Sequence, residues 1–169
     1  VRAQPRSFGC LGDASLQGFA RRCAASGIHI GNAIETPDAT DAWQMNVQIL
    51  ALCNEQRQNN GLEKLMTRED LWEQVAQVRA GEIVNYFSHT RPNGSSCFSL
   101  YDEAGLDYRA AGENIAAGYY GASAVVDGWM NSTGHRANIL SESYDYLATG
   151  YATGGAYGTN YCQNFLGDW

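Results

Sequence analysis

The order of hydrophobic patterns along the chain limits its fold more than any other feature. Helical spacing fills the middle of the sequence, and strand-like alternation is concentrated near its end. Residues 146–153 and 157–166 alternate on either side of Gly154-Gly155, which predicts a β-hairpin with a glycine turn. A short extended segment over 113–116 stands among the helices. This order predicts an α+β domain built in layers.

Two long helices are predicted in the first half of this body. The first covers 42–59, with Met45, Ile49, Leu52, Cys53 and Gln56 on one face and Asn59-Asn60-Gly61 as its stop signal. The second runs from Thr67 to Tyr86. Asp70 lies three residues after Thr67 as in a capping box, and the expected buried stripe is Leu71, Val75, Val78 and Ile83.

Three shorter helices are predicted around the extended segment. One runs from residue 96 or 97 to Ala104 and is closed by Gly105. Another covers 122–131 and turns Val125, Val126 and Trp129 toward the core, and a third covers 133–140 with Ser132 as its N-cap. The mixed polar and aromatic composition of the C-terminal hairpin predicts one packed face and one less packed face.

The chain divides into a leader, residues 1–40, and a body, residues 41–169. The leader is expected to hold a short amphipathic helix over 13–26 and a linker over 31–41. Residues 1–30 carry four arginines and one acid, a net of +3, whereas the remainder holds seven bases and seventeen acids, a net of −10. Such an acidic body repels phosphate backbones, so a nucleic-acid partner is not expected.

No apolar run reaches the roughly 18–20 residues that a membrane-spanning helix needs. We read Val1 as the start of a trimmed chain, so the sequence does not argue for a cytosolic location.

Five dispersed cysteines without a CxxC pair exclude a zinc cluster. They leave open two disulfides with one remaining thiol, or buried thiols such as Cys53 and Cys162.

Polar, glycine-containing segments hold two of the three histidines. His89 lies in Phe-Ser-His-Thr-Arg-Pro-Asn-Gly, His135 lies in Ser-Thr-Gly-His-Arg, and Glu113 lies between them in Gly-Glu-Asn. Imidazole is a common metal ligand and changes charge near neutral pH, so this set suggests a metal or acid–base site. His29, in an apolar context, is read as structural.

Five motifs together resemble a known family. They are ILALCNEQRQNNGLEKL, NYFSHTRPNG, AGENIAAG, VVDGWMNSTGHRANIL and GYATGGAYGTNYCQNF, in this order within residues 43–167. They are similar to the bacterial SCP-like branch of the CAP superfamily (cysteine-rich secretory proteins, antigen 5 and pathogenesis-related proteins). The resemblance implies a three-layer α/β/α sandwich ending in the hairpin. It also implies a secreted or cell-surface location and a cleft lined by histidines and acids.

Carried over by motif, the implied cleft residues are His89, Glu113, Asn114, Ser132 and His135. His89 and His135 would hold a divalent metal such as zinc. Ser132 stands where many relatives have a second glutamate, so the expected metal binding is weak. Glu113 would be a third ligand or a hydrogen-bond partner of an imidazole, although it could also simply hold a turn.

The resemblance favours a binding module for a lipid, peptide or protein over an enzyme. One alternative is a metal-assisted hydrolase with Glu113 as general base. Ser132 is a second catalytic candidate because it lies three residues before His135, but no G-x-S-x-G elbow is present and helix capping is its expected role. Another alternative is a structural component of the cell surface or spore. The sequence does not predict the oligomeric state.

Overall fold

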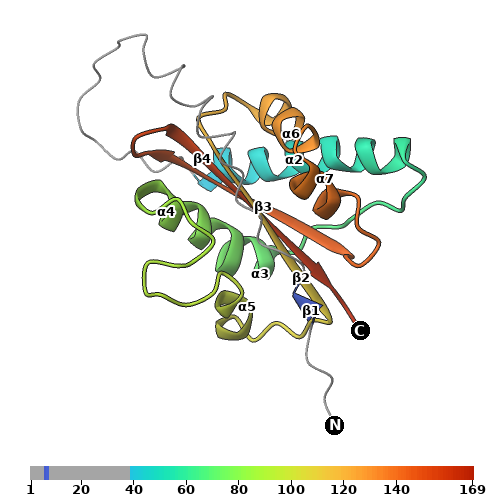
Figure 1. Ribbon diagram of the computed structural model, residues 1–169, viewed down its shortest axis with the longest axis horizontal. Coiled ribbons are helices and arrows are strands. Elements are labelled where there is room, and N and C mark those ends of the chain that lie inside the picture. Colours follow the sequence, from blue (N-terminus) through green and yellow to red (C-terminus); the bar gives the residue numbers. More distant parts are fainter. Residues whose placement is uncertain (1–5, 8–38) are drawn as a thin grey trace.

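A computed structural model describes residues 6–7 and 39–169 as a sheet between two layers of helices (Figure 1). The order of the four strands is β1-β2-β4-β3. This arrangement confirms the predicted α+β sandwich. The predicted leader helix and Cys10, Cys23 and His29 lie outside the described residues, as does the linker up to residue 38.

The sheet is antiparallel apart from its first strand. β2 (Ala110–Ala117) pairs with β4 (Gly158–Gly167), and β4 pairs with β3 (Tyr146–Gly154). β1 (Arg6–Ser7) adds a short parallel pairing to the start of β2. The predicted C-terminal hairpin is therefore confirmed. Its turn contains Gly154, Gly155 and Gly158, all with positive φ, a conformation that favours glycine.

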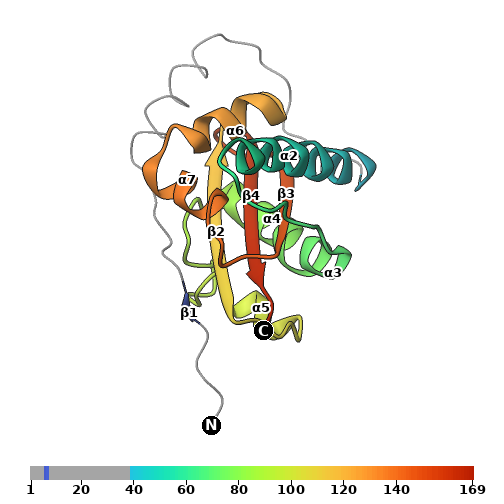
Figure 2. The same ribbon diagram turned by 90° about the vertical axis from the view of Figure 1, so that its right-hand side faces the viewer.

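One helical layer consists of α2 (Ala39–Asn59), α6 (Ala122–Met130) and α7 (Thr133–Ile139) (Figure 2). These helices match the predicted ones within a few residues. Their apolar side chains meet the sheet in one cluster that includes Ile49, Trp129, Tyr161 and Phe165, each fully buried. Cys53 lies in the same cluster, as its position on the apolar face predicted.

The opposite layer contains α3 (Glu69–Leu71), η1 (Trp72–Ala76), α4 (Gln77–Asn85) and α5 (Ser99–Glu103). The first three follow one another directly, so the predicted second helix forms with a π-helical turn inside it. The predicted capping box is wrong, because the helix begins at Glu69 and has no side-chain cap. Asp70 instead binds Arg68 and the backbone N–H of Leu71.

The buried stripe of this helix also differs from the prediction. Val78 is 40% exposed, whereas Arg79 is fully buried between Val75 and Ile83 in the same stripe. A π turn winds more widely than 3.6 residues per turn, so the buried stripe advances in steps of four residues. An arginine therefore enters the interior where an apolar residue was expected.

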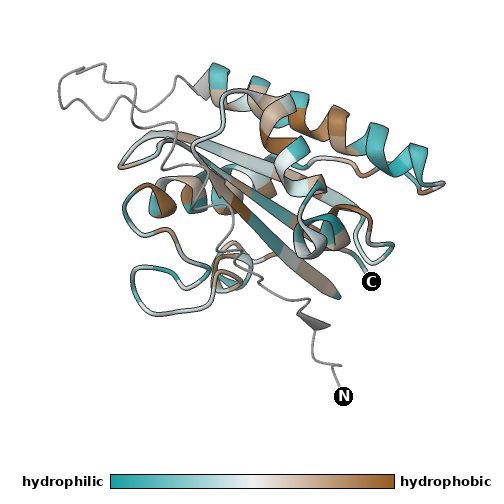
Figure 3. Cartoon of the chain, turned by 45° about the horizontal axis from the view of Figure 1, so that its top comes forward, coloured by the Kyte–Doolittle hydropathy of each residue, from teal (hydrophilic) through white to brown (hydrophobic). Residues whose placement is uncertain are grey.

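Both faces of β4 are buried, so the prediction of one less-packed hairpin face is wrong. Helices cover the sheet on both sides, and the strands contain hydrophilic as well as hydrophobic residues (Figure 3). Asn160, Gln163 and Asn164 are all fully buried. The interior is thus held by hydrogen bonds in addition to apolar packing.

Gly150 is a point of very close approach between β3 and the helical run. A Cβ added at this position would lie 1.9 Å from the backbone oxygen of Ala76. A Cβ added at Gly81, in α4, would meet no such neighbour within 4 Å. The absence of a side chain at Gly150 therefore lets the helix pack directly on the strand.

Gly150→Ala should lower the free energy of unfolding by about 1–3 kcal/mol or more, because strand and helix must separate to fit the methyl group. Gly81→Ala is the matched control and should raise it by about 0.5–1 kcal/mol, because alanine favours a helix. Urea denaturation of both variants measures the effect. Equal stabilities would contradict the packing argument.

Candidate functional site

The centre of the site is a buried ion pair between the sheet and α4. Glu113 of β2 and Arg79 of α4 are both fully buried. Arg79 Nε donates to Glu113 Oε2 at 2.8 Å, and Arg79 Nη2 donates to Oε1 at 3.1 Å. Two parallel contacts of this kind fix the orientation of the carboxylate and stabilise its negative charge.

His89 completes this centre from the loop that follows α4. Its Nδ1 lies 2.8 Å from Glu113 Oε1, and its side chain is 14% exposed. Arg79 Nη2 also donates to the backbone oxygen of Ser88 at 2.7 Å, which positions the residue next to His89. Cys162 Sγ donates to Glu113 Oε2 at 3.3 Å. Each carboxylate oxygen thus faces two protein groups.

The environment holds Glu113 in its ionised form. Burial alone would raise the pKa of this carboxyl, but the hydrogen bonds from His89 and Arg79 outweigh burial and place the pKa below its ordinary value. An ionised carboxylate can only accept hydrogen bonds. His89 Nδ1 therefore carries a proton in this contact.

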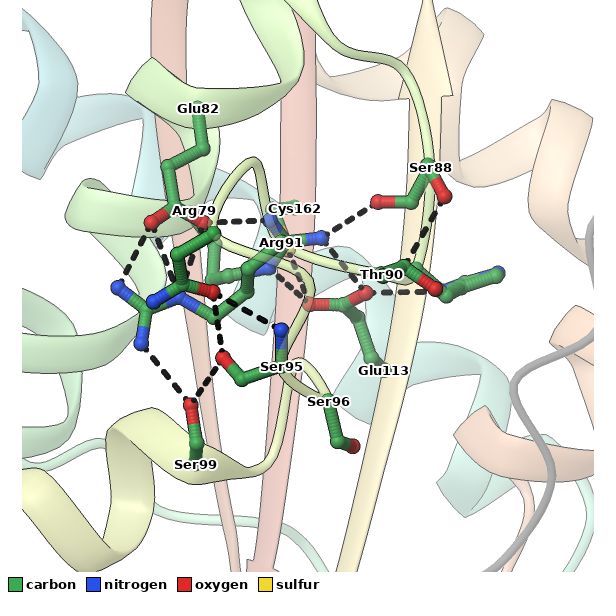
Figure 4. A network of polar contacts seen from close by, with 12 residues as sticks. Arg79, Glu82, Ser88, Thr90, Arg91, Ser95, Ser96, Ser99, Glu113 and Cys162 are labelled. Carbon is green, nitrogen blue, oxygen red and sulfur yellow. Dashed lines mark hydrogen bonds and ion pairs between the residues drawn. The ribbon is translucent and has the colours of Figure 1, made fainter.

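A chain of charges continues from this centre toward the surface (Figure 4). Arg79 Nη1 binds Glu82 at 2.7 Å, Glu82 binds Arg91 at 2.8 Å, and Arg91 binds Glu103 at 2.7 Å. The loop of residues 87–98, here the His89 loop, is also closed by the backbone hydrogen bond from Cys97 N to His89 O. The position of His89 thus depends on several ion pairs.

Three side chains of this region could supply metal ligands. The ligand atoms that His89, Cys97 and Glu113 offer all lie within 4.8 Å of one another. Nitrogen, thiolate and carboxylate donors suit zinc in kind. Ligands at about 2.0–2.1 Å from a tetrahedral ion lie roughly 3.3 Å apart, so the 2.8 Å contact of His89 and Glu113 fits a hydrogen bond better. Arg79 opposes a cation there because it is itself positive.

The other predicted residues lie on the α7 side. His135 is buried in α7, and its backbone oxygen accepts a hydrogen bond from Asn114 Nδ2 at 3.1 Å. Asn138 Nδ2 in turn donates to Asn114 Oδ1 at 2.8 Å. These contacts hold α7 against β2. His135 is not among the three residues that share the metal-capable group in the described part of the chain.

Ser132 lies at the N-cap position of α7, but its side chain makes no capping hydrogen bond there. Its predicted position is therefore confirmed, while the predicted capping contact is absent. The structure brings His89 and Glu113 into direct contact, and Asn114 occupies the next position on β2 with contacts to α7. The roles of these residues in catalysis, cleft lining or metal binding remain predictions.

Sequence reasoning missed Arg79 and Cys97. Arg79 had a visible signal, since it is a charged residue spaced four residues from both Val75 and Ile83 on an apolar stripe. A buried arginine in such a stripe requires an acidic partner. Cys97 had no comparable signal, because its distance from Glu113 depends on how the His89 loop folds back.

Comparisons with known proteins agree with this architecture. The model of the cysteine-rich secretory protein family, CAP, matches residues 50–165. The protein YkwD of Bacillus subtilis is 33% identical over 91% of this chain, and the membrane protein YlbC of the same organism is 38% identical over 72%. This chain spans 58% of the length of YkwD and 34% of YlbC.

Solved structures give the same result. An extracellular SCP-domain protein of Bacillus anthracis is 28% identical, with a TM-score of 0.65 over 85% of this chain and 45% of its own. An outer surface protein of Borrelia burgdorferi is 16% identical, with a TM-score of 0.70 over 81% of this chain and 100% of its own, and supports the fold alone. In the described residues, no helix is long and apolar enough to cross a bilayer.

Glu113→Gln should lower the free energy of unfolding by about 3–5 kcal/mol near pH 7, because it leaves Arg79 buried without its main counter-ion. The pKa of Glu113 is lower in the folded chain than in the unfolded chain, so its stabilisation is present above the ordinary value of 4.5. It is lost as pH falls through the folded-state pKa. In urea titrations, the difference in unfolding free energy between wild type and Glu113→Gln should therefore shrink as the pH falls below 4.5.

Glu103→Gln is the control, because Glu103 is half exposed and its ion pair with Arg91 contributes about 0–1 kcal/mol. A gap between wild type and Glu113→Gln that stayed constant from pH 7 to pH 3 would contradict an ionised Glu113 as the source of the stabilisation.

Proposed function

The chain belongs to the cysteine-rich secretory protein (CAP) family, and from this we propose that it is a binding module of an extracellular or cell-surface protein. The location is supported by the SCP-domain protein of Bacillus anthracis, which is described as extracellular. The proposed recognition group is His89, the partly exposed member of the buried centre. Its partner would be a lipid, a peptide or another protein, the classes that the family resemblance implies.

The observation that carries this proposal is the set of hydrogen bonds that the Glu113 carboxylate already accepts. Both carboxylate oxygens already accept hydrogen bonds from Arg79, His89 or Cys162, and the carboxyl pKa lies below its ordinary value. An effective general base has a pKa near the working pH and room to take a proton. Glu113 therefore suits the role of an anchor that orients His89 better than the role of general base in the hydrolase alternative.

The binding proposal is tested with a defined panel of phosphatidylglycerol vesicles, phosphatidylcholine vesicles and immobilised peptides. We expect the wild-type chain to bind one class, and His89→Ala to weaken that binding at least tenfold, because the partly exposed imidazole is removed. His135→Ala removes the other predicted imidazole, which is buried, and should leave the binding unchanged if His89 is the recognition group. Binding that survives His89→Ala would favour the structural-component alternative, in which this site has no ligand.

The same panel distinguishes an enzyme. Metal-dependent hydrolysis of a panel peptide or ester, lost in a folded Glu113→Gln protein, would overturn the binding-module proposal. Circular dichroism of the variant checks that it is folded. Without turnover in the wild type, the anchor role stands.

We further propose that any divalent metal binds this site weakly and through the His89 side. An ion must displace the hydrogen bond between His89 and Glu113 and lie near the Arg79 guanidinium. Glu113 is already bound by Arg79, so the proposed principal donors are the other two ligand candidates, His89 and Cys97. This differs from the two-histidine set, His89 and His135, predicted from the sequence.

A zinc titration by calorimetry at neutral pH checks the ligand set. His89→Ala and Cys97→Ser should each reduce the affinity about tenfold or more, and His135→Ala should leave it unchanged. An equal loss in His89→Ala and His135→Ala, with none in Cys97→Ser, would restore the two-histidine site.

A further inference from the structure

The outer edge of β3 is closed by side chains from both helical layers. In the part of the chain that the structure describes, β3 has a full strand partner, β4, on one side only. An edge strand normally presents a row of backbone groups that can pair with another chain. On β3 the outward N–H and C=O groups belong to every second residue, because the backbone groups of the residues between them point toward β4.

Each of the outward backbone N–H groups at Leu147, Thr149 and Tyr151 has an acceptor. Leu147 N donates to Met66 O at 2.8 Å. Thr149 N donates to Asn46 Oδ1 at 2.8 Å, and Tyr151 N donates to Gln77 Oε1 at 3.1 Å. One backbone segment and two side-chain amides thus occupy positions that a neighbouring strand would take.

Two of the outward carbonyl groups, those of Thr149 and Tyr151, are engaged in the same way. Trp72 Nε1 donates to Thr149 O at 3.2 Å, and Gln77 Nε2 donates to Tyr151 O at 2.8 Å. Gln77 therefore gives Tyr151 both the acceptor and the donor that a paired strand residue would give. Its primary amide reproduces the hydrogen-bonding groups of a peptide unit.

The π turn explains how one helix reaches two positions on the strand. Trp72 is the first residue of η1 and Gln77 follows its last residue, and the backbone N–H of Gln77 donates to Trp72 O, five residues back. In a regular α-helix, residues five apart point about 140° away from each other. Thr149 and Tyr151, whose carbonyl groups these side chains reach, are two strand residues apart, about 6.8 Å. The wider turn brings both side chains to the edge.

Asn46 closes the edge from the opposite layer. It belongs to α2, is fully buried, and also donates through Nδ2 to Thr67 Oγ1 at 3.4 Å. α2 and the run from α3 to α4 lie on opposite faces of the sheet near β3 (Figure 2). The two layers therefore meet around this strand.

We propose that Asn46, Trp72 and Gln77 form a strand-mimicking closure that keeps two copies of this chain from pairing through β3. The closure uses uncharged groups, so it should work across a wide range of salt concentrations. Without it, two copies could align their β3 strands antiparallel about a two-fold axis and form one continuous sheet.

Hydrogen exchange on the wild-type chain tests the closure directly. The amide hydrogens of Thr149 and Tyr151 should exchange as slowly as those of Ala148, Gly150 and Ala152, which point toward β4. Rapid exchange at Thr149 and Tyr151, with protection at the other three, would overturn the proposal. This measurement needs no variant and no ligand.

Gln77→Ala tests the consequence, with Gln74→Ala as the matched control because Gln74 is exposed in the same helical run. In sedimentation velocity, the mass of Gln77→Ala should rise with concentration toward twice the 18.4 kDa of one chain, relative to the control. Gln77→Met, which keeps the side-chain length but not the hydrogen bonds, should behave like Gln77→Ala.

Gln77→Glu separates edge pairing from simple destabilisation. It also loses the donor to Tyr151 O, but its charge at the edge disfavours a neighbouring strand. It should therefore remain at the control mass. Association of Gln77→Glu to the same extent, or control-like masses for both Gln77→Ala and Gln77→Met, would overturn the proposal.

Discussion

The buried contact between Arg79 and Glu113 is the interaction on which the site depends. Removing two charges from water costs several kcal/mol for each ion, and their attraction offsets this cost only where further hydrogen bonds satisfy both groups. Here the guanidinium binds Glu113, Glu82 and the backbone of Ser88, and the carboxylate also receives His89. Sheet, helix and loop are therefore joined by one set of polar contacts, and the imidazole position follows from it.

Because the Arg79–Glu113 contact organises the site, Glu113 and His89 are suited to different chemical roles. A carboxylate held by an arginine is a strong acceptor and a weak base, so Glu113 orients its neighbours more readily than it takes a proton. His89 is 14% exposed, which makes it the member of the centre that we propose for recognition. The positive charge of Arg79 also weakens the attraction of the centre for a cation. These constraints are the reason for proposing recognition rather than metal-assisted hydrolysis.

Prediction from the sequence succeeded where neighbours along the chain decide the structure. The periodicity of 42–59 predicted α2, and the glycine turn predicted the C-terminal hairpin. It failed where distant segments decide. The stripe through Val78 was wrong because a π turn packs beside Gly150. The hairpin has no open face because helices from other parts of the chain cover both sides. The local sequence pattern predicts neither the packing of the π turn beside Gly150 nor the helices that cover the hairpin.

The sequence alone determined the class of fold and identified His89, Glu113 and His135 as its distinctive polar residues. Only the tertiary structure decided their partners. Arg79 and Glu113 are 34 residues apart, and Cys162 is 49 residues from Glu113, so their contacts arise from strand register and helix packing. Chemistry at a buried site depends on which charges share the same low-dielectric space. That sharing is a property of the folded chain.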